Sequence, residues 1–420
     1  MEFIVRHSAD FRKVNISLFL GGLVTFASMY CVQPLLPIFA HDFRVTPSVA
    51  SLVLSVTTGI LAVMITFASS FSNAWGRKSI MGASLFCTAA ITIVSAWSPN
   101  FTILLICRSV EGCVLAGIPA IAMVYLGEEI SPKHLGTAMG LYIGGCAFGG
   151  MLGRFITGIL TDLFSWRIAM LGIGLIGIIS SWYFLQNLPP SKHFVRQPFS
   201  AKQHIRGLGQ QLKKPYLLCL YGIGFLLMGS FVTLYSYSGY QLIAPPYDLS
   251  QEMIGWLFSI YLLGMLGSSC MSGLANRWPR QQVLVFGIGL MLIGVLMTLN
   301  ASLILKLLGI AFVTFSFFGS HAIASSWVSQ QAAGGKAYAS ALYLCFYYIG
   351  SSVGNTSGGF FWSASGWTGV VGLISAFLLI CLVLALVLPR LSAHQLSSEM
   401  EYVVERESSV SRMAVEESKV

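Results

Sequence analysis

Two oppositely charged residues, Arg108 and Glu111, lie within an otherwise apolar stretch at residues 101–126. Their spacing of three places both side chains on one face of a helix. An unpaired charge at the centre of a bilayer costs roughly 3 kcal/mol, so such residues normally face a cavity and find a partner. We therefore predict that Glu111 accepts a transported proton, while Arg108 stabilises its ionised form. The alternative is a permanent ion pair that ties this helix to a neighbour.

Two further ionisable side chains lie in apolar stretches. His321 is able either to relay protons or to act as a hydrogen-bond partner between helices. Arg154 lies close to the end of its stretch and is followed by Asp162 and Arg167. We expect Arg154 to extend to the membrane interface, with its charge among the lipid headgroups. A role in a gate on that side is the alternative.

The composition indicates the environment of these residues. Apolar residues make up 55% of the 420 and charged residues 9%, whereas soluble domains contain about 25% charged residues. A helix crosses the hydrocarbon core in about 20 residues, and the alternation typical of membrane β-strands is absent here. We predict an all-α membrane protein with twelve transmembrane helices, at residues 15–39, 50–73, 79–97, 101–126, 135–158, 166–186, 216–240, 251–274, 282–300, 303–328, 336–360 and 367–388.

The net charge of +9 is distributed unevenly between the two sides of these helices. Most basic residues lie before the first span, in alternate loops or after the last span, and only Arg44, Arg167 and Lys306 lie on the other side. Cytoplasmic loops are enriched in Lys and Arg. The asymmetry predicts a multi-pass membrane protein with both termini and the middle loop in the cytoplasm. It explains the charge without nucleic acid, so we expect the lipid bilayer as the surrounding partner.

The sequence contains an internal repeat. Residues 69–81 (SSFSNAWGRKSIM) are similar to residues 272–284 (SGLANRWPRQQVL), and residues 140–166 are similar to residues 341–367. A repeat at half the chain length is typical of secondary transporters built from two related bundles. We predict two pseudo-symmetric six-helix bundles at residues 1–190 and 215–390, a cytoplasmic linker at 191–214, and a disordered or loosely helical cytoplasmic tail at 391–420.

Several segments resemble motifs of the major facilitator superfamily. Residues 69–78 (SSFSNAWGRK) are similar to its loop pattern G-x-L-A-D-R-x-G-R-K, and LICRSVEG around Arg108 is similar to the motif of its fourth span. YCVQPLLP at residues 30–37 resembles the drug:proton antiporter branch, and the resemblance implies a location in a bacterial inner membrane. The sequence departs from the family patterns at two places. Asn73 stands where the loop pattern has an acidic residue, and no proline follows Gly145, where the glycine-rich pattern of the antiporters has one.

The resemblance implies that the loops after the second and eighth spans gate the cytoplasmic side. A glycine permits a tight turn there, and basic side chains are able to bind helix C-termini or acids such as Glu128 and Glu129. The alternative is that these charges only set the topology. The candidate gating residues are Asn73, Gly76, Arg77, Lys78, Asn276, Arg277 and Arg280.

The resemblance also implies a central cavity lined mainly by spans one, four, seven and ten. Aromatic walls with few charges suit apolar or amphipathic compounds, including cations. The candidate substrate contacts, for each of which simple packing is the alternative, are Tyr30, Gln33, Tyr142, Tyr235, Tyr343 and Tyr347. Close helix packing is predicted for Gly145, Gly149, Gly150, Gly153, Gly350 and Gly354.

Other classes of chemistry lack support in the sequence. No nucleotide-binding loop or catalytic motif occurs, and the nine cysteines show no paired spacing, so we predict no enzyme activity, cofactor or metal. The predicted function is proton-coupled efflux of a small organic molecule by a monomeric secondary transporter, through alternating access of its two halves. Proton-linked uptake, sugar efflux and a non-transporting membrane sensor or scaffold are the alternatives.

Overall fold

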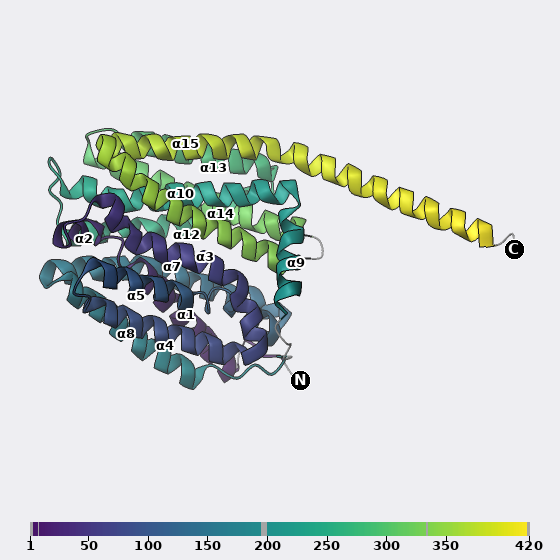
Figure 1. The fold of residues 1–420 in the computed structure, drawn as a ribbon, viewed down its shortest axis with the longest axis horizontal. Coiled ribbons are helices and arrows are strands. Elements are labelled where there is room, and N and C mark those ends of the chain that lie inside the picture. Colours follow the sequence, from purple (N-terminus) through teal and green to yellow (C-terminus); the bar gives the residue numbers. More distant parts are fainter. Residues whose placement is uncertain (1–2, 7, 195–199, 333–334, 418–420) are drawn as a thin grey trace.

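Two bundles of helices pack side by side in the computed structural model (Figure 1), which describes residues 3–6, 8–194, 200–332 and 335–417. Within helices, the side chains of residues 69–70, 73–74, 201 and 389–417 are outside this description. Over the described residues, ten helices are long and apolar enough to cross a membrane. The twelve predicted spans are accounted for because the fourth is divided into two shorter helices and the last two are joined in one element.

The first bundle contains α1 (Ala9–Tyr30), α2 (Leu36–Asp42), α3 (Pro47–Trp75), α4 (Arg77–Ala96), α5 (Phe101–Leu115), α6 (Ala122–Glu129), α7 (Pro132–Leu163) and α8 (Trp166–Asn187). Helix α9 (Ala201–Leu212) follows in the linker. The second bundle contains α10 (Pro215–Ile243), α11 (Gln251–Leu257), the 3₁₀ turn η1 (Phe258–Ile260), α12 (Tyr261–Leu274), α13 (Arg280–Met297), α14 (Leu303–Gln331) and α15 (Lys336–Glu417).

The first span is interrupted at a proline. α1 ends at Tyr30 because Pro34 has no N–H to donate to the carbonyl of Tyr30 and disfavours a helical conformation at Gln33. In a continuous helix the N–H of Gln33 would donate to the carbonyl of Met29, but here it donates to Tyr30 at 3.0 Å. The carbonyl of Met29 is therefore available to another donor.

The fourth span differs from the single helix that we predicted at residues 101–126. α5 ends at Leu115 and α6 begins at Ala122, after turns that contain Pro119. Pro119 lacks the N–H that would bond the carbonyl of Leu115, so the helix cannot continue undisturbed. The apolar length of the segment indicated one span correctly, but its proline divides that span into two helices.

The last two spans run in opposite directions within α15. Ser365 and Gly366 have non-helical dihedral angles, and Gly366 has a φ of 58°, which favours glycine. The chain reverses there: Gly359 lies against α3 near α2, whereas the carbonyl of Leu384 accepts a hydrogen bond from Cys219 near the start of α10. Beyond the bundle, α15 continues through the tail as a helical arm that extends away from the protein (Figure 1).

Equivalent glycine contacts occur in the two bundles. Where α7 crosses α1, a Cβ atom on Gly149 would lie 2.2 Å from the carbonyl oxygen of Leu23. Where α15 crosses α10, a Cβ atom on Gly350 would lie 2.1 Å from the carbonyl oxygen of Phe225. No side chain fits at such distances, so these helices approach as closely as glycine allows. The same restriction applies to the backbone contacts of Gly145, Gly153 and Gly354.

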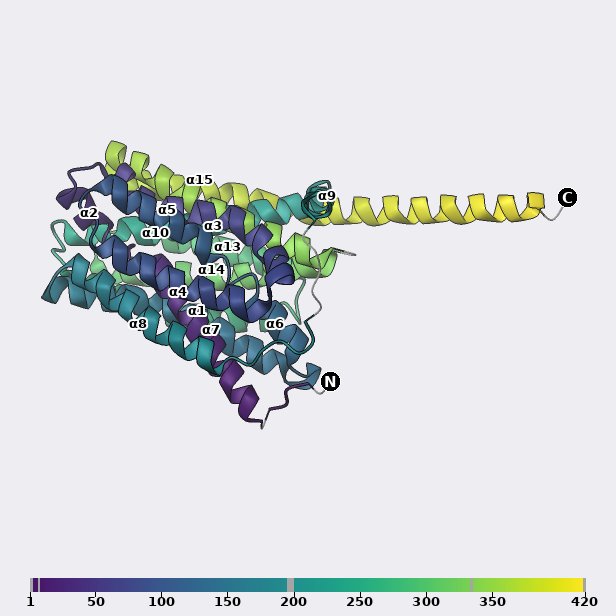
Figure 2. The same ribbon diagram turned by 60° about the horizontal axis from the view of Figure 1, so that its bottom comes forward.

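The two bundles meet closely at the end that contains α2. A Cβ atom on Gly158 of α7 would lie 2.7 Å from the carbonyl oxygen of Gln251 in α11. In the other bundle, a Cβ atom on Gly359 of α15 would lie 2.3 Å from the Cα of Ser48 in α3. Helix α9 and both termini lie at the opposite end (Figures 1 and 2). We call these two ends the α2 end and the α9 end.

Candidate functional site

Arg108 and Glu111 form an ion pair inside the first bundle. Both side chains are fully buried, and Nη1 of Arg108 donates to Oε2 of Glu111 at 2.6 Å. The hydroxyl of Thr92 in α4 donates to Oε1 of Glu111 at 3.3 Å. Arg108 also donates to backbone carbonyls of Met29 in α1 and Val53 in α3. The pair therefore connects α5 with three neighbouring helices.

This ion pair lies beside the interruption of the first span. Nη2 of Arg108 donates at 2.8 Å to the carbonyl of Met29, which the interruption leaves available. A cation is favourable at the C-terminus of a helix, so Arg108 stabilises the end of α1. Cys31, the first residue after α1, is within electrostatic reach of Arg108, Glu111 and Arg154. Two buried charged sites thus flank one short turn at residues 31–35.

Arg154 lies inside the protein, so our expectation that it reaches the membrane interface was wrong. Its exposed fraction is 1%. Nε donates to Oε1 of Gln33 at 2.7 Å, and Nη1 donates to the carbonyl of Gly150 at 2.5 Å. The physical reason is the length of α7, which extends to Leu163 and so places Arg154 farther from the helix end than the predicted span implied.

Rings from both bundles surround the guanidinium group of Arg154. Its central carbon lies 4.1 Å from the ring centroid of Tyr30 in the first bundle. It lies 4.9 Å from that of Phe258 and 4.8 Å from that of Tyr261 in the second bundle. Gln33 connects the bundles too, because its Nε2 donates to the hydroxyl of Ser236 in α10 at 2.9 Å. Arg154 therefore lies at the junction between the bundles.

A continuous set of rings leads away from Arg154 through the second bundle. Tyr235 lies 4.9 Å from Tyr261 and 5.0 Å from Phe231 between ring centroids. Phe231 stacks on Phe317 at 3.9 Å, and Phe317 stacks on His321 at 6.0 Å. We call this set the aromatic series; its members are Phe258, Tyr261, Tyr235, Phe231, Phe317, His321 and Tyr347.

His321 belongs to α14 and lies beside Tyr343 and Tyr347 of α15. Its Nδ1 is 2.9 Å from the hydroxyl of Tyr343, and its ring is 4.6 Å from that of Tyr347. His321 and Tyr347 are half-buried, whereas Tyr235 near Arg154 is fully buried. The rings on α14 and α15 are therefore less buried than Tyr235, and Tyr347 lies within electrostatic range of Tyr30 and Tyr261 beside Arg154.

Five of the six candidate substrate contacts belong to this region, and Tyr142 does not. Tyr30 and Gln33 contact Arg154 directly, Tyr235 and Tyr347 belong to the aromatic series, and Tyr343 contacts His321. Tyr142 is buried in a separate core cluster of the first bundle, with residues of α1, α4 and α6. Tyr142 is also within electrostatic range of Tyr348 in α15, so its role as a substrate contact stays a prediction.

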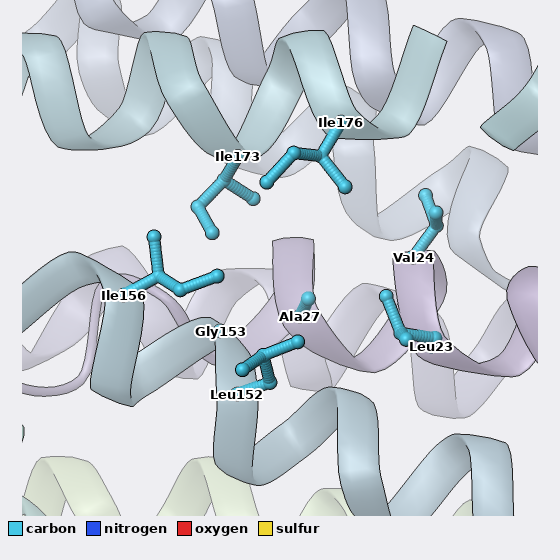
Figure 3. A pocket seen from close by; sticks show the side chains of 8 residues that line it. All are labelled: Leu23, Val24, Ala27, Leu152, Gly153, Ile156, Ile173 and Ile176. Atoms are coloured by element: carbon cyan, nitrogen blue, oxygen red, sulfur yellow. The ribbon is translucent and has the colours of Figure 1, made fainter. Parts of the chain in front are cut away.

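A small cavity inside the first bundle is distinct from this region. Its volume is about 10 Å³. Only apolar residues of α1, α7 and α8 line it, and Figure 3 shows their side chains converging on it: Leu23, Val24, Ala27, Leu152, Gly153, Ile156, Ile173 and Ile176. Such a volume is about that of one water molecule, so an organic molecule does not fit there.

The first candidate gating loop contains a two-point ion pair. Gly76 adopts a φ of 95° between α3 and α4, and Arg77 follows as the first residue of α4. Nη2 and Nε of Arg77 donate to the two carboxylate oxygens of Glu128 in α6, at 2.7 and 3.1 Å. Arg77 also donates to the hydroxyl of Ser72. Lys78 is half-buried beside it, and the side chain of Asn73 lies outside the described residues.

In the second candidate gating loop, the corresponding arginine bonds a neutral side chain and not a carboxylate. Arg280, the repeat equivalent of Arg77, donates to the side-chain oxygen of Gln330 near the end of α14. Asn276 and Arg277 are exposed. Glu129, which we considered as a partner for the first loop, instead accepts a hydrogen bond from the backbone N–H of His193 at 2.9 Å.

Sequence reasoning missed the arrangement around Arg154 and the rings of Phe258 and Tyr261. One signal was present: the offset of 201 residues that relates Gly149 to Gly350 also relates Arg154 to Asn355. Both are polar residues within apolar spans, and both are buried. A polar residue at the same repeat position in both halves indicates a shared position at the junction and not two interfacial side chains.

Comparisons with known proteins agree on one family. A family model described as Major Facilitator Superfamily matches residues 18–244 and 226–410. The chain is 46% identical over 382 residues to the uncharacterized MFS-type transporter YybF of Bacillus subtilis, covering 91% of this chain and 95% of that protein. It is 41% identical over 381 residues to the inner membrane transport protein YnfM of Escherichia coli, covering 91% of each.

A solved structure supports the same fold. A bacterial homologue of the human lysosomal transporter Spinster, described as inward-facing and unoccupied, superimposes with a TM-score of 0.75 at 15% identity, covering 92% of this chain and 98% of that one. At this identity the likeness establishes the fold alone. The two related bundles, the family model over most of the chain and these relatives lead to one conclusion: the chain belongs to the major facilitator superfamily, as a multi-pass membrane transporter of small molecules and not an enzyme.

Proposed function

We propose that the protein exports a small amphipathic organic compound in exchange for protons, by alternating access of its two bundles. The observation that supports this most is the position of the Arg108–Glu111 pair beside the turn at residues 31–35. The other side of that turn holds Gln33 and Arg154. The candidate proton site and the candidate substrate site therefore contact one short, buried segment.

Protonation of Glu111 has a direct structural consequence in this mechanism. A neutral carboxyl group no longer balances Arg108, so the guanidinium group is drawn more strongly to the backbone carbonyls of Ser28 and Met29. That change alters the end of α1 and the orientation of Gln33, which donates to the second bundle. Proton uptake at Glu111 would in this way change the contact between bundles at Arg154.

Closure at the α2 end supports the alternating-access part of the proposal. We propose that the α2 end faces the periplasm and the α9 end, with both termini, faces the cytoplasm. The glycine contacts at Gly158 and Gly359 then close the periplasmic side in this conformation. The Spinster homologue whose structure is similar is described as inward-facing, which agrees with this assignment. Opening that side requires these two glycine contacts to separate.

Purified protein in liposomes tests the proposal. Compounds that raise its melting temperature are identified first, because ligands stabilise the state that they bind. One of them is then supplied under a pH gradient, and its movement and the internal pH are followed together. The compound should move against entering protons. Glu111→Gln should abolish gradient-driven movement but keep exchange of labelled for unlabelled compound, whereas Asp10→Asn, at the first turn of α1, should change neither.

Three results would contradict the proposal. Gradient-driven transport that survives Glu111→Gln would reject Glu111 as the proton carrier and favour the permanent ion pair. Movement of compound and protons in the same direction would replace efflux by proton-linked uptake. Binding without any movement of compound in either direction would indicate a sensor or scaffold.

A further inference from the structure

Arg154 is a buried cation without a carboxylate partner among the described residues. The ion pairs between those residues join other groups: Arg77 with Glu128, Arg108 with Glu111, and histidines with Asp42 and Glu129. The hydrogen bonds of Arg154 end on neutral acceptors: the side chain of Gln33, the backbone carbonyl of Gly150 and the hydroxyl of Tyr261. Its positive charge is therefore solvated by dipoles and ring faces only.

Such a charge is costly without a counter-ion. Burying a cation retains a penalty of several kcal/mol unless an anion or a full set of hydrogen bonds offsets it. The Arg108 site in the same bundle shows the offset in full, since that guanidinium group has both a carboxylate and several carbonyls. The Arg154 site lacks the carboxylate, and it lies at the junction between the two bundles.

From these contacts we propose that Arg154 binds the anionic group of the substrate, which is therefore an amphipathic organic anion. This inference depends on the proposed transport function and specifies its substrate class. A guanidinium group matches carboxylate, sulfonate and phosphate oxygens through paired N–H donors. The aromatic series then covers the apolar body of the same molecule, from Tyr261 near Arg154 toward half-buried Tyr347.

The arrangement disfavours the cationic compounds that the aromatic residues alone suggested. Arg154 already occupies the ring faces of Tyr30, Phe258 and Tyr261, which are the surfaces that would attract a second cation. A ligand ammonium group there would face a like charge at short range. A neutral ligand would leave the charge of Arg154 as unbalanced as it is without ligand.

A matched set of three probes tests the charge preference. 2-Naphthoate, 2-naphthamide and 2-naphthylmethylammonium share one ring system and differ in the charge of the polar group. Apparent Kd values come from the concentration dependence of the melting temperature of the purified full-length protein. We expect the carboxylate to bind at least tenfold more tightly than the amide, and the ammonium compound to bind most weakly.

Variants connect that preference to Arg154. Arg154→Gln should reduce the carboxylate-to-amide ratio to about one, and Arg154→Lys should keep part of it because the charge remains. Arg167→Gln is the matched control, since Arg167 is exposed at the start of α8, where it lies over Trp166. If Arg154→Gln does not fold, the probe ratio of the unmodified protein and the lysine variant still decide the matter.

The outcomes separate this inference from the transport proposal. Equal binding of carboxylate and amide, absence of carboxylate binding, or an unchanged ratio in Arg154→Gln overturns the anion site. An equal Arg154-dependent shift with chloride or sulfate alone overturns the organic ligand in favour of an inorganic anion. Gradient-driven transport of a neutral or cationic compound keeps the transport proposal and rejects this one. Tight carboxylate binding without gradient-driven movement keeps the anion site and rejects the transport proposal.

Discussion

The two bundles share a fold but differ in where they place charge. Arg154 in α7 and Asn355 in α15 occupy equivalent repeat positions, and both are buried. Asn355 donates from Nδ2 to the carbonyl of Ser51 and the hydroxyl of Ser55 across the junction, at 2.9 and 3.0 Å. One bundle thus contributes a cation to the junction, and the other contributes a neutral amide at the matching place.

The same difference recurs at two other places. The buried ion pair of α5 corresponds to an apolar stretch of α14, with Ile310 and Val313 buried. The ion pair of Arg77 corresponds to the bond between Arg280 and neutral Gln330. Both Arg–Glu ion pairs therefore lie in the first bundle, whereas all the rings of the aromatic series lie in the second.

The largest expected effect concerns the buried ion pair. Arg108→Leu leaves Glu111 as an unpaired buried charge, which should lower the free energy of unfolding by about 3–5 kcal/mol. Arg108→Leu combined with Glu111→Leu should restore more than half of that loss, because no charge remains. Chemical unfolding in mixed micelles measures both. Ile310→Val, in the apolar counterpart, should cost only about 1 kcal/mol. Equal losses for Arg108→Leu and Ile310→Val would remove the contrast between the bundles.

An intermediate effect on stability is expected at the α2 end, where each bundle contributes one close glycine contact. Gly158→Leu and Gly359→Leu should each destabilise the closed α2 end by about 1–3 kcal/mol, because a side chain would overlap the facing backbone. Spin-label distances across the α2 end should then increase in both variants. Gly289→Leu is the control, since its Cβ atom would meet nothing within 4 Å. Opening in only one of the two variants would show that the closure is not symmetric.

A smaller effect on the transport rate should distinguish the two candidate gating loops. Arg77→Gln removes a charge-assisted, two-point bond, so it should slow transport several-fold, an effect of about 1 kcal/mol. Arg280→Gln replaces a bond to a neutral amide and should have a smaller effect. Initial rates in liposomes at low and high salt measure both. Salt should weaken the contribution of Arg77 only, and equal salt dependence in the two loops would argue for a common topological role.

The smallest effect concerns His204 of α9, which lies between Phe67 of α3 and Tyr338 of α15 at ring distances of 5.1 and 5.5 Å. Burial lowers the pKa of His204 below its ordinary value. The docked helix therefore binds fewer protons than the undocked one, so docking is complete above about pH 6.5 and weakens as the pH falls through that value. Spin labels on α9 and α15 should separate on acidification, and His204→Phe should abolish the change.

The sequence predicted the spans and the repeat well for a physical reason. Apolar length and repeated glycines are set by the bilayer and by close helix contacts, and both are local properties of the chain. The pairing of Arg108 with Glu111 was also predictable, because the partners share one helix face. The turn containing Gly76 followed from its glycine and its position between two spans.

The environment of Arg154 was not predictable in the same way. Its partners come from α1, η1 and α12, which are distant in sequence and belong to two bundles. Whether an arginine near a span end points to lipid headgroups or to the protein interior depends on the helix length and on those partners. The interruption of the fourth span at Pro119 was readable but was outweighed by the apolar composition around it.

The interruption of the first span has one more consequence. Inside a continuous helix each carbonyl accepts a hydrogen bond from the backbone amide four residues later, and the strength of that bond does not vary with pH. At Met29 the holder is the side chain of Arg108, whose attraction to that carbonyl depends on the charge of Glu111. Under the proposed mechanism, the end of α1 therefore responds to the protonation of Glu111 through the hydrogen bonds of Arg108.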